Sequence, residues 1–146
     1  MEVDTVLVPV DGSEEAMEAV EYAIAVAERY DAGVHALYVL DEDAAAAIQE
    51  GDVEAAAVAR RGEQVMAGVR ALADAHGVLV DHSSAYGFSW RRLSQHPGSV
   101  ILDVAESLDA DFVVVPREPV TGHPEAVIEK AAEYVLAHAS QPVLSV

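Results

Sequence analysis

Short apolar runs alternate along this chain with longer segments in which apolar residues recur every three or four positions. Runs of about four to eight residues rich in β-branched side chains are typical of buried strands, and the longer spacing is typical of helices with one face against a core. The elements expected on this basis are strands over residues 3–10, 34–40, 78–86, 112–115 and 142–146, and helices beginning at Ser13, Asp52, Pro97 and Pro124.

Strands that alternate with helices in this way indicate βαβ units, and therefore a mostly parallel sheet covered by helices on both faces. Because βαβ crossovers are almost always right-handed, the choice narrows to a doubly wound sheet of the flavodoxin-like or Rossmann-like kind. The strand over residues 78–86 becomes polar in its second half, from Asp81 to Ser84, which favours a place at the sheet edge. No internal repeat is evident, and we expect one domain over residues 1–146.

The chain is strongly acidic: 26 aspartates and glutamates oppose 8 lysines and arginines, for a formal net charge of -18. Self-repulsion on this scale weakens a compact fold in dilute salt, whereas molar salt shortens the screening length to about 3 Å. The composition therefore indicates a halophilic protein, adapted to high salt. It also disfavours nucleic-acid binding, because no basic face is available for a phosphate backbone.

Other classes of protein are excluded by what the sequence lacks. There are no cysteines, which rules out disulfides, thiol catalysis and thiolate metal sites. No apolar run approaches the roughly 20 residues that span a bilayer, and the acidic amino terminus lacks the organisation of a signal peptide. We therefore expect a cytoplasmic protein with no membrane association.

Four segments of the chain resemble the universal stress protein (UspA-like) family. They are residues 8–13 (Val-Pro-Val-Asp-Gly-Ser), residues 39–41 (Val-Leu-Asp), residues 97–115 and the tail over residues 131–146, which is the most specific of the four. The resemblance implies a three-layer α/β sandwich of the adenine nucleotide alpha hydrolase-like kind, with five strands in the order 3-2-1-4-5. It also implies a homodimer formed by pairing the last strands of two chains, with an interface at Pro142, Val143, Leu144, Ser145 and Val146.

In nucleotide-binding members of this family, glycines follow the fourth strand at a fixed spacing: glycine, two residues, glycine, nine residues, then glycine and serine or threonine. Glycines let the backbone approach phosphates closely and point its amides at them, and a helix amino terminus adds a favourable dipole. In this chain the corresponding positions are Pro116, Pro119, Glu129 and Lys130. The spacing is kept, and every glycine is replaced.

Each of these replacements disfavours phosphate. Proline has no amide hydrogen to donate, so Pro116 and Pro119 remove two donors. The carboxylate of Glu129 would repel a unit negative charge about 4 Å away by about 1 kcal/mol in water and about 4 kcal/mol at an effective dielectric constant of 20. Lys130 and Arg117 offset only part of this repulsion. We therefore expect no cofactor, and no ATP bound in the manner of the family.

Two further positions meet the ribose and the base of a nucleotide if the resemblance holds: Asp11 and Val39. Asp11 is equally well explained as a turn residue that caps the first helix together with Ser13. Val39 is better explained as a core side chain.

Residues 88–95 (Phe-Ser-Trp-Arg-Arg-Leu-Ser-Gln) form an insertion relative to the family pattern, in which the third strand runs almost directly into the next helix. One interpretation is a lid or partner-docking loop, with Trp90 as an apolar anchor and Arg91 and Arg92 binding a carboxylate or phosphate. Arg117 is a further candidate for such a contact. The other interpretation is a surface flap whose arginines pair with the protein's own acids.

Motifs for catalysis and metal binding are absent from the sequence. His82, His96 and His123 fall towards one sheet edge, but their spacing is not that of a metal site. No Gly-x-Ser-x-Gly motif is present, so an α/β serine hydrolase is not indicated. Arg60 and Arg61 lie on the polar side of a glutamate-rich helix, where we expect a surface role.

The function expected from the sequence is that of a non-enzymatic, dimeric module of the stress response, without catalytic residues or metal. The alternative is a nucleotide- or small-anion-binding protein that uses Asp11 and the arginines of the 88–95 loop in place of glycine amides. A small α/β enzyme is a third possibility, supported only by analogy of fold.

Overall fold

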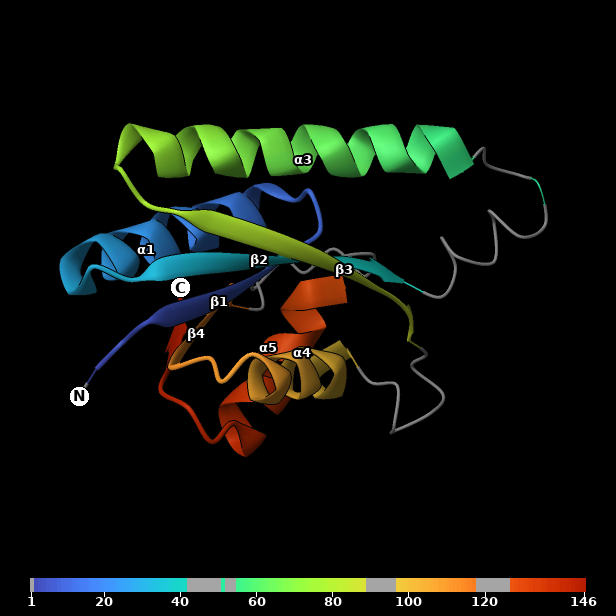
Figure 1. Cartoon of the computed structure of the whole chain (residues 1–146). Coiled ribbons are helices and arrows are strands. Elements are labelled where there is room, and N and C mark those ends of the chain that lie inside the picture. The colour runs from blue at the N-terminus through green and yellow to red at the C-terminus, as the bar shows by residue number, and fades with distance from the viewer. Residues whose placement is uncertain (1, 42–50, 52–54, 89–96, 118–126) are drawn as a thin grey trace.

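A computed structural model describes residues 2–41, 51, 55–88, 97–117 and 127–146. Its strands are β1 (Thr5–Val10), β2 (Gly33–Asp41), β3 (Val80–Phe88), β4 (Phe112–Val115) and β5 (Val143–Ser145), and its helices are α1 (Glu14–Tyr30), α3 (Ala55–Ala75), α4 (Pro97–Ser107) and α5 (Val127–His138). The strands form one parallel sheet in the order β3-β2-β1-β4-β5. Helices α1 and α3 cover one face and α4 and α5 the other (Figure 1). The predicted fold class is confirmed.

The core is built around β1, which pairs with β2 on one side and β4 on the other. All residues from Val6 to Val10 are buried, because neighbouring strands flank this strand and helices cover both of its faces. On α1 the buried positions recur at helical spacing, from Ala16 through Val20 and Ile24 to Ala27, as predicted. The buried residues of β1 and α1 thus anchor the carboxyl end of β1 in the core.

The ends of α1 follow the expected capping chemistry. The hydroxyl of Ser13 accepts a hydrogen bond from the amide of Ala16 at 3.2 Å, and Glu14 and Glu15 lie in the first turn, where the helix dipole favours negative charge. The helix ends at Tyr30, and Asp31 adopts the left-handed conformation with φ of 55°. The turn after β1 is therefore held in place by the helix that follows it.

The expected bounds of β3 were wrong at both ends, although its place at the sheet edge is confirmed. The strand begins at Val80 rather than Val78, because the amide of Val78 donates to the carbonyl of Ala73 at 2.9 Å in the turn that ends α3. It continues through Phe88, which pairs with Asp41 after a shift in register. Phe88 is thus the last residue of a strand and not the first residue of a loop.

Smaller differences concern the first and last strands. Val3 is buried but precedes β1, which starts at Thr5, and β5 is one residue shorter at each end than residues 142–146. The helix starts expected at Asp52 and Pro124 lie outside the described residues.

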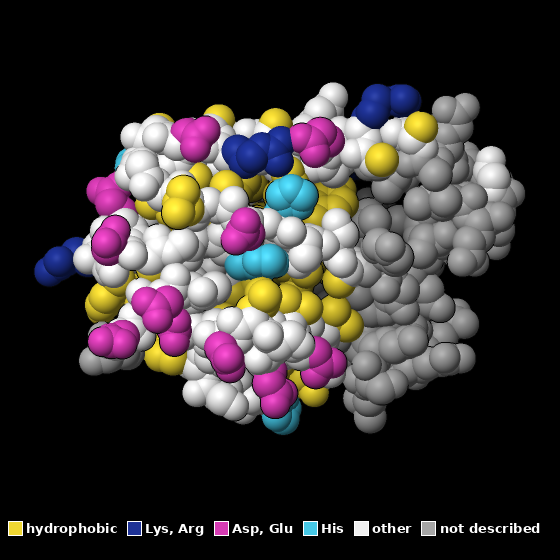
Figure 2. Space-filling view, viewed as in Figure 1, with side chains coloured by type: hydrophobic (Ala, Val, Ile, Leu, Met, Phe, Trp, Pro, Cys, Tyr) yellow, Lys and Arg dark blue, Asp and Glu magenta, His cyan; other side chains and the backbone are white. Residues whose placement is uncertain are grey.

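None of the described helices has the length and apolar character needed to cross a lipid bilayer. Carboxylates are scattered over the face shown in Figure 2, with few lysine or arginine side chains among them.

Candidate functional site

The carboxyl ends of β1 and β4 mark the point at which a ligand is expected in a sheet of this order. The chain leaves β1 through α1 to reach β2, whereas β4 lies on the opposite side of β1. In open sheets of this kind, ligands bind outside the strand ends at such a switch point. The described residues that follow these two strand ends are the turn from Asp11 to Ser13 and the pair Pro116 and Arg117.

The turn after β1 is fixed by Asp11. Its Oδ1 atom accepts a hydrogen bond from the amide of Ser13 at 2.9 Å, and Gly12 between them has φ of 87°, a conformation that glycine adopts without steric cost. The interpretation of Asp11 as a turn residue is therefore correct. An ionised carboxylate has about four lone-pair sites, so this bond leaves Asp11 able to accept from a ligand as well.

Helix α3 brings an arginine against this turn. The Nη2 and Nε atoms of Arg61 lie 3.7 and 3.9 Å from the position that a Cβ atom on Gly12 would occupy. The approach is close because Gly62 packs over Tyr38, where an added Cβ would lie 3.3 Å from the ring. Arg61 is exposed to solvent, as expected, but its position beside the Gly12 turn was missed. The one signal in the sequence was Gly62, since glycine in a helix interior costs stability and often marks a close approach.

The charges of Arg61 and Asp11 both affect the pKa of Tyr38. Its side chain is buried beneath α3, and burial raises the pKa of its hydroxyl, while Arg61 lowers that pKa and Asp11 raises it. The two charges therefore act on the Tyr38 hydroxyl in opposite directions. One corner of the carboxyl edge thus combines a carboxylate, a guanidinium and a neutral hydroxyl.

The end of β4 offers fewer hydrogen-bond donors to an anion. Pro116 is buried at the end of the strand and has no amide hydrogen. The amide of Arg117 donates to the carbonyl of Val146 at 2.5 Å, and its Nε donates to the carbonyl of Ser145 at 3.4 Å. The guanidinium of Arg117 is exposed and keeps its Nη donors, so its role as an anion contact stays a prediction.

The other predicted site residues fall into two groups. Val39 is buried in the core, in agreement with the structural interpretation of that residue, and Glu129 and Lys130 lie within α5. The remaining four lie outside the described residues: Trp90, Arg91, Arg92 and Pro119.

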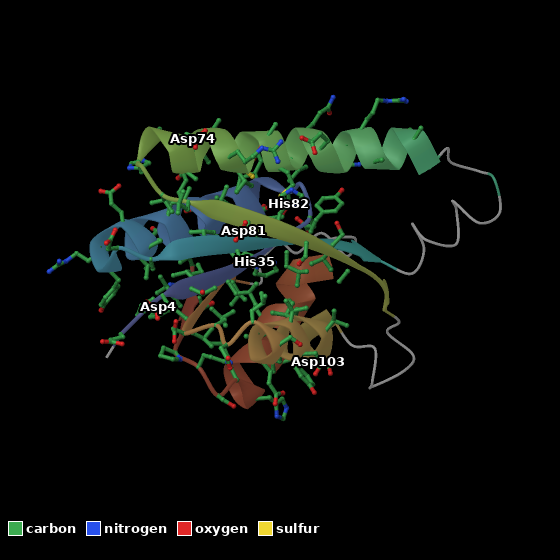
Figure 3. All side chains as sticks on the ribbon, viewed as in Figure 1. Asp4, His35, Asp74, Asp81, His82 and Asp103 are labelled. Carbon is green, nitrogen blue, oxygen red and sulfur yellow. The ribbon has the colours of Figure 1, made fainter. Side chains whose placement is uncertain are left out.

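A second polar cluster lies on the outer strands β2 and β3, away from the carboxyl edge. His35 pairs in register with Asp81, and its Nε2 atom is 2.8 Å from the hydroxyl oxygen of Ser83. Figure 3 shows His35, Asp81 and His82 side by side on the two strands. Within the described ranges, no group of three or more histidine and acidic side chains is arranged to hold a metal ion.

The cluster makes stability depend on pH. Burial lowers the pKa of His35 from its ordinary value of 6.5, and His82 lowers it further, whereas Asp81 opposes the shift. Because the unfolded chain then binds more protons than the folded chain, this contribution to stability is present above pH 6.5 and is lost as the pH falls through the folded-state pKa.

His35→Gln should remove that part of the dependence. We expect denaturant midpoints measured between about pH 5 and 8 to fall less steeply on acidification for the variant than for the unaltered protein. Parallel profiles for the two proteins would contradict the assignment to His35.

Comparison with known proteins decides the family. The model of the universal stress protein family matches residues 2–146. The chain belongs to the universal stress protein family. A universal stress protein of Methanocaldococcus jannaschii is 29% identical over 144 residues, which cover 97% of this chain and 80% of that protein.

Solved structures of universal stress proteins have the same fold. UspA from Lactobacillus plantarum superposes with a TM-score of 0.72 at 25% identity, over 100% of this chain and 99% of that one. The universal stress protein from Archaeoglobus fulgidus in complex with dAMP superposes with a TM-score of 0.68 at 16% identity, over 99% and 98%. These matches agree with the strand order described above.

Proposed function

We propose that this universal stress protein is a non-enzymatic, dimeric module of the cytoplasmic stress response that does not bind ATP in the manner of its nucleotide-binding relatives. The observation that carries the proposal is Pro116. It occupies the position of the first glycine in the family's phosphate-binding pattern, it is buried, and it has no amide hydrogen to offer a phosphate.

The neighbouring positions support the same conclusion. The last glycine and the following serine or threonine of the pattern are replaced by Glu129 and Lys130, and both residues lie within α5. They lie in its first turn, where the carboxylate of Glu129 would add negative charge that repels a phosphate.

The proposed dimer rests on the edge strand β5. The carbonyl of Pro142 accepts from the amide of Val113, and the amide of Val146 donates to the carbonyl of Val115, both at 3.0 Å. Successive residues of a strand direct their amide groups to alternate sides, so those of Val143 and Ser145 face away from β4. An unpaired row of this kind is a template for pairing with a second chain.

The nucleotide content of the purified protein tests the loss of ATP binding. We expect chromatography of the extract from denatured protein to show no nucleotide in stoichiometric amount. ATP released in near-equimolar amount would contradict the proposal. The protein should be purified in molar salt, where its charge of -18 is screened.

A second candidate function is the binding of a small anion, and the structure changes which residues support it. The arginines of the 88–95 loop lie outside the described residues. Arg61, however, lies beside Gly12 and near Asp11 and Tyr38. This cation at the carboxyl edge is the specific observation in favour of the second candidate.

A further inference from the structure

We propose that Ser83 is a site of covalent acylation, where the serine takes an acyl group from an activated ester or thioester and His35 removes its proton. The two residues lie on the outer strands β3 and β2, away from the ends of β1 and β4. The inference therefore goes beyond the proposed function and does not rest on it. Acylation of one serine modifies the protein itself and needs no catalytic turnover.

Ser83 and His35 are in direct contact. The Nε2 atom of His35 lies 2.8 Å from the Oγ atom of Ser83, within the range of about 2.6–3.2 Å that joins a nucleophile to its base. Both residues are partly exposed to solvent, so a reagent can reach the hydroxyl. A neutral imidazole that carries its proton on Nδ1 accepts from the hydroxyl through Nε2. The pair is thus placed for transfer of the serine proton to the histidine.

Asp81 supports His35 as a base. The two residues pair in register, so their side chains project from the same face of the sheet, and Figure 3 shows them on adjacent strands. Burial, together with His82, holds the pKa of His35 below 6.5, and the ring is therefore neutral and able to accept a proton at neutral pH. The charge of Asp81 raises that pKa, which means that it favours the imidazolium formed when the proton is taken up.

The outer edge of β3 supplies donors for the oxygen of the acyl group. The carbonyl of Leu79 accepts from the amide of Val34 at 2.9 Å, so the main chain of Leu79 faces β2. Because successive residues of a strand direct their amides to alternate sides, those of His82 and Ser84 face away from β2. Within the described residues, β3 pairs with β2 alone. Donors of the kind that stabilise a developing oxyanion therefore flank Ser83 along the chain.

The surroundings of Ser83 determine the class of reagent. Asp81 is exposed and the chain has a net charge of -18, so a phosphoryl donor with several negative charges is repelled. The carbonyl group of an ester or thioester is uncharged and meets no such repulsion. Leu37 pairs with Ser83 in register, and Ala85 is the next residue on the same face of β3. These apolar neighbours suit a small acyl group such as acetyl.

The modification is a single acyl transfer. The Oγ atom of Ser83 forms a bond to the acyl carbon, and its proton passes to Nε2 of His35. The C–O or C–S bond to the leaving group then breaks, and that group departs with the electron pair and takes the proton from His35. The products are O-acyl-Ser83, a neutral imidazole and a free alcohol or thiol.

Incubation with p-nitrophenyl acetate in molar salt, followed by mass spectrometry of peptides, tests the site. We expect Ser83 to be acetylated at least about tenfold faster than Ser84. Ser84 is the more exposed of the two and projects from the opposite face of β3, so exposure alone predicts the reverse order. Equal rates at the two serines would overturn the proposal. This comparison is made within the unaltered protein and does not depend on the folding of a variant.

Two variants test the role of the histidine. His35→Gln keeps a polar side chain without a base, and it should slow acetylation of Ser83 by about a hundredfold, the lower end of the effect of a general base. Ser84→Ala is the matched control and should leave that rate within about twofold of the unaltered protein. An unchanged rate in His35→Gln would contradict the role given to His35. Far-ultraviolet circular dichroism checks that both variants keep the fold.

The release of p-nitrophenol separates this inference from the proposed function. A release of one equivalent for each chain that is lost in Ser83→Ala would support acylation of this serine. A release that continues beyond one equivalent and is lost in the same variant would also support Ser83 as the acyl acceptor, but it would contradict the non-enzymatic function. A release that Ser83→Ala leaves unchanged would overturn the inference alone.

Discussion

Replacing Gly98 with alanine is expected to lower the free energy of unfolding by about 2–3 kcal/mol, the upper part of the range for overpacked cores. Gly98 lies in α4 where that helix packs against Tyr134 of α5. A Cβ atom on Gly98 would lie 2.6 Å from the Cβ and Cδ1 atoms of Tyr134 and 2.8 Å from its Cγ, well inside the contact distance of carbon atoms. Because one clashing atom is attached directly to the backbone, rotation of the tyrosine cannot relieve the contact, and the helices must move apart.

Gly68→Ala is the matched control for that substitution. Gly68 lies in α3, and among the described residues a Cβ atom there would meet only the terminal methyl group of Met17, at 3.7 Å. Alanine is favoured over glycine in a helix by up to about 1 kcal/mol, so this variant should unfold at the same or higher denaturant concentration than the unaltered protein. Equal stability of Gly98→Ala and Gly68→Ala in chemical denaturation would contradict the described packing of α4 on α5.

Ser145→Pro is expected to convert the proposed dimer to a monomer that keeps its fold. The amide of Ser145 faces away from β4, so its loss leaves the pairing of β4 with β5 intact. Each of the two chains in a dimer would lose an edge donor and gain a proline ring in its place. At up to about 1.5 kcal/mol for each hydrogen bond, the dissociation constant should rise by about a hundredfold before steric effects are added.

Size-exclusion chromatography with light scattering measures that outcome, with Ser145→Ala as the control. The alanine variant keeps the amide and should elute with the unaltered protein. A dimer that survives Ser145→Pro would show that the chains associate through another surface. Deletion of residues 142–146 is a harsher test of the same idea, and it should leave a monomer or an unfolded chain, because β5 also pairs with β4.

Much of the fold was predictable from the sequence because its elements are set by local patterns. The buried run of β1 and the helical spacing on α1 followed from periodicity, and the ends of α1 followed from Ser13 and Asp31. The alternation of strands and helices predicted a doubly wound sheet but did not decide between the flavodoxin-like and the Rossmann-like kind. The strand order came from the resemblance to the family. The start of β3 was misplaced because Val78 is apolar yet belongs to the turn that ends α3.

The candidate site was predictable only in part, because it depends on how helices sit on the sheet. The position of Asp11 follows from its place after β1, and the loss of amides at Pro116 follows from the side chain itself. The approach of Arg61 to Gly12 follows from the packing of Gly62 against Tyr38, which joins residues far apart in the sequence. Gly62 marks a close approach of α3 to the sheet, but it does not indicate that Arg61 reaches the Gly12 turn.

Isothermal titration with ATP in molar salt is the most direct test of the account, since the central claim is a universal stress protein without the family's phosphate-binding backbone. With a proline in place of the first glycine, we expect no heat of binding that corresponds to micromolar affinity, which would require about -8 kcal/mol of binding free energy. Saturable binding of ATP at micromolar affinity and one site per chain would contradict the claim.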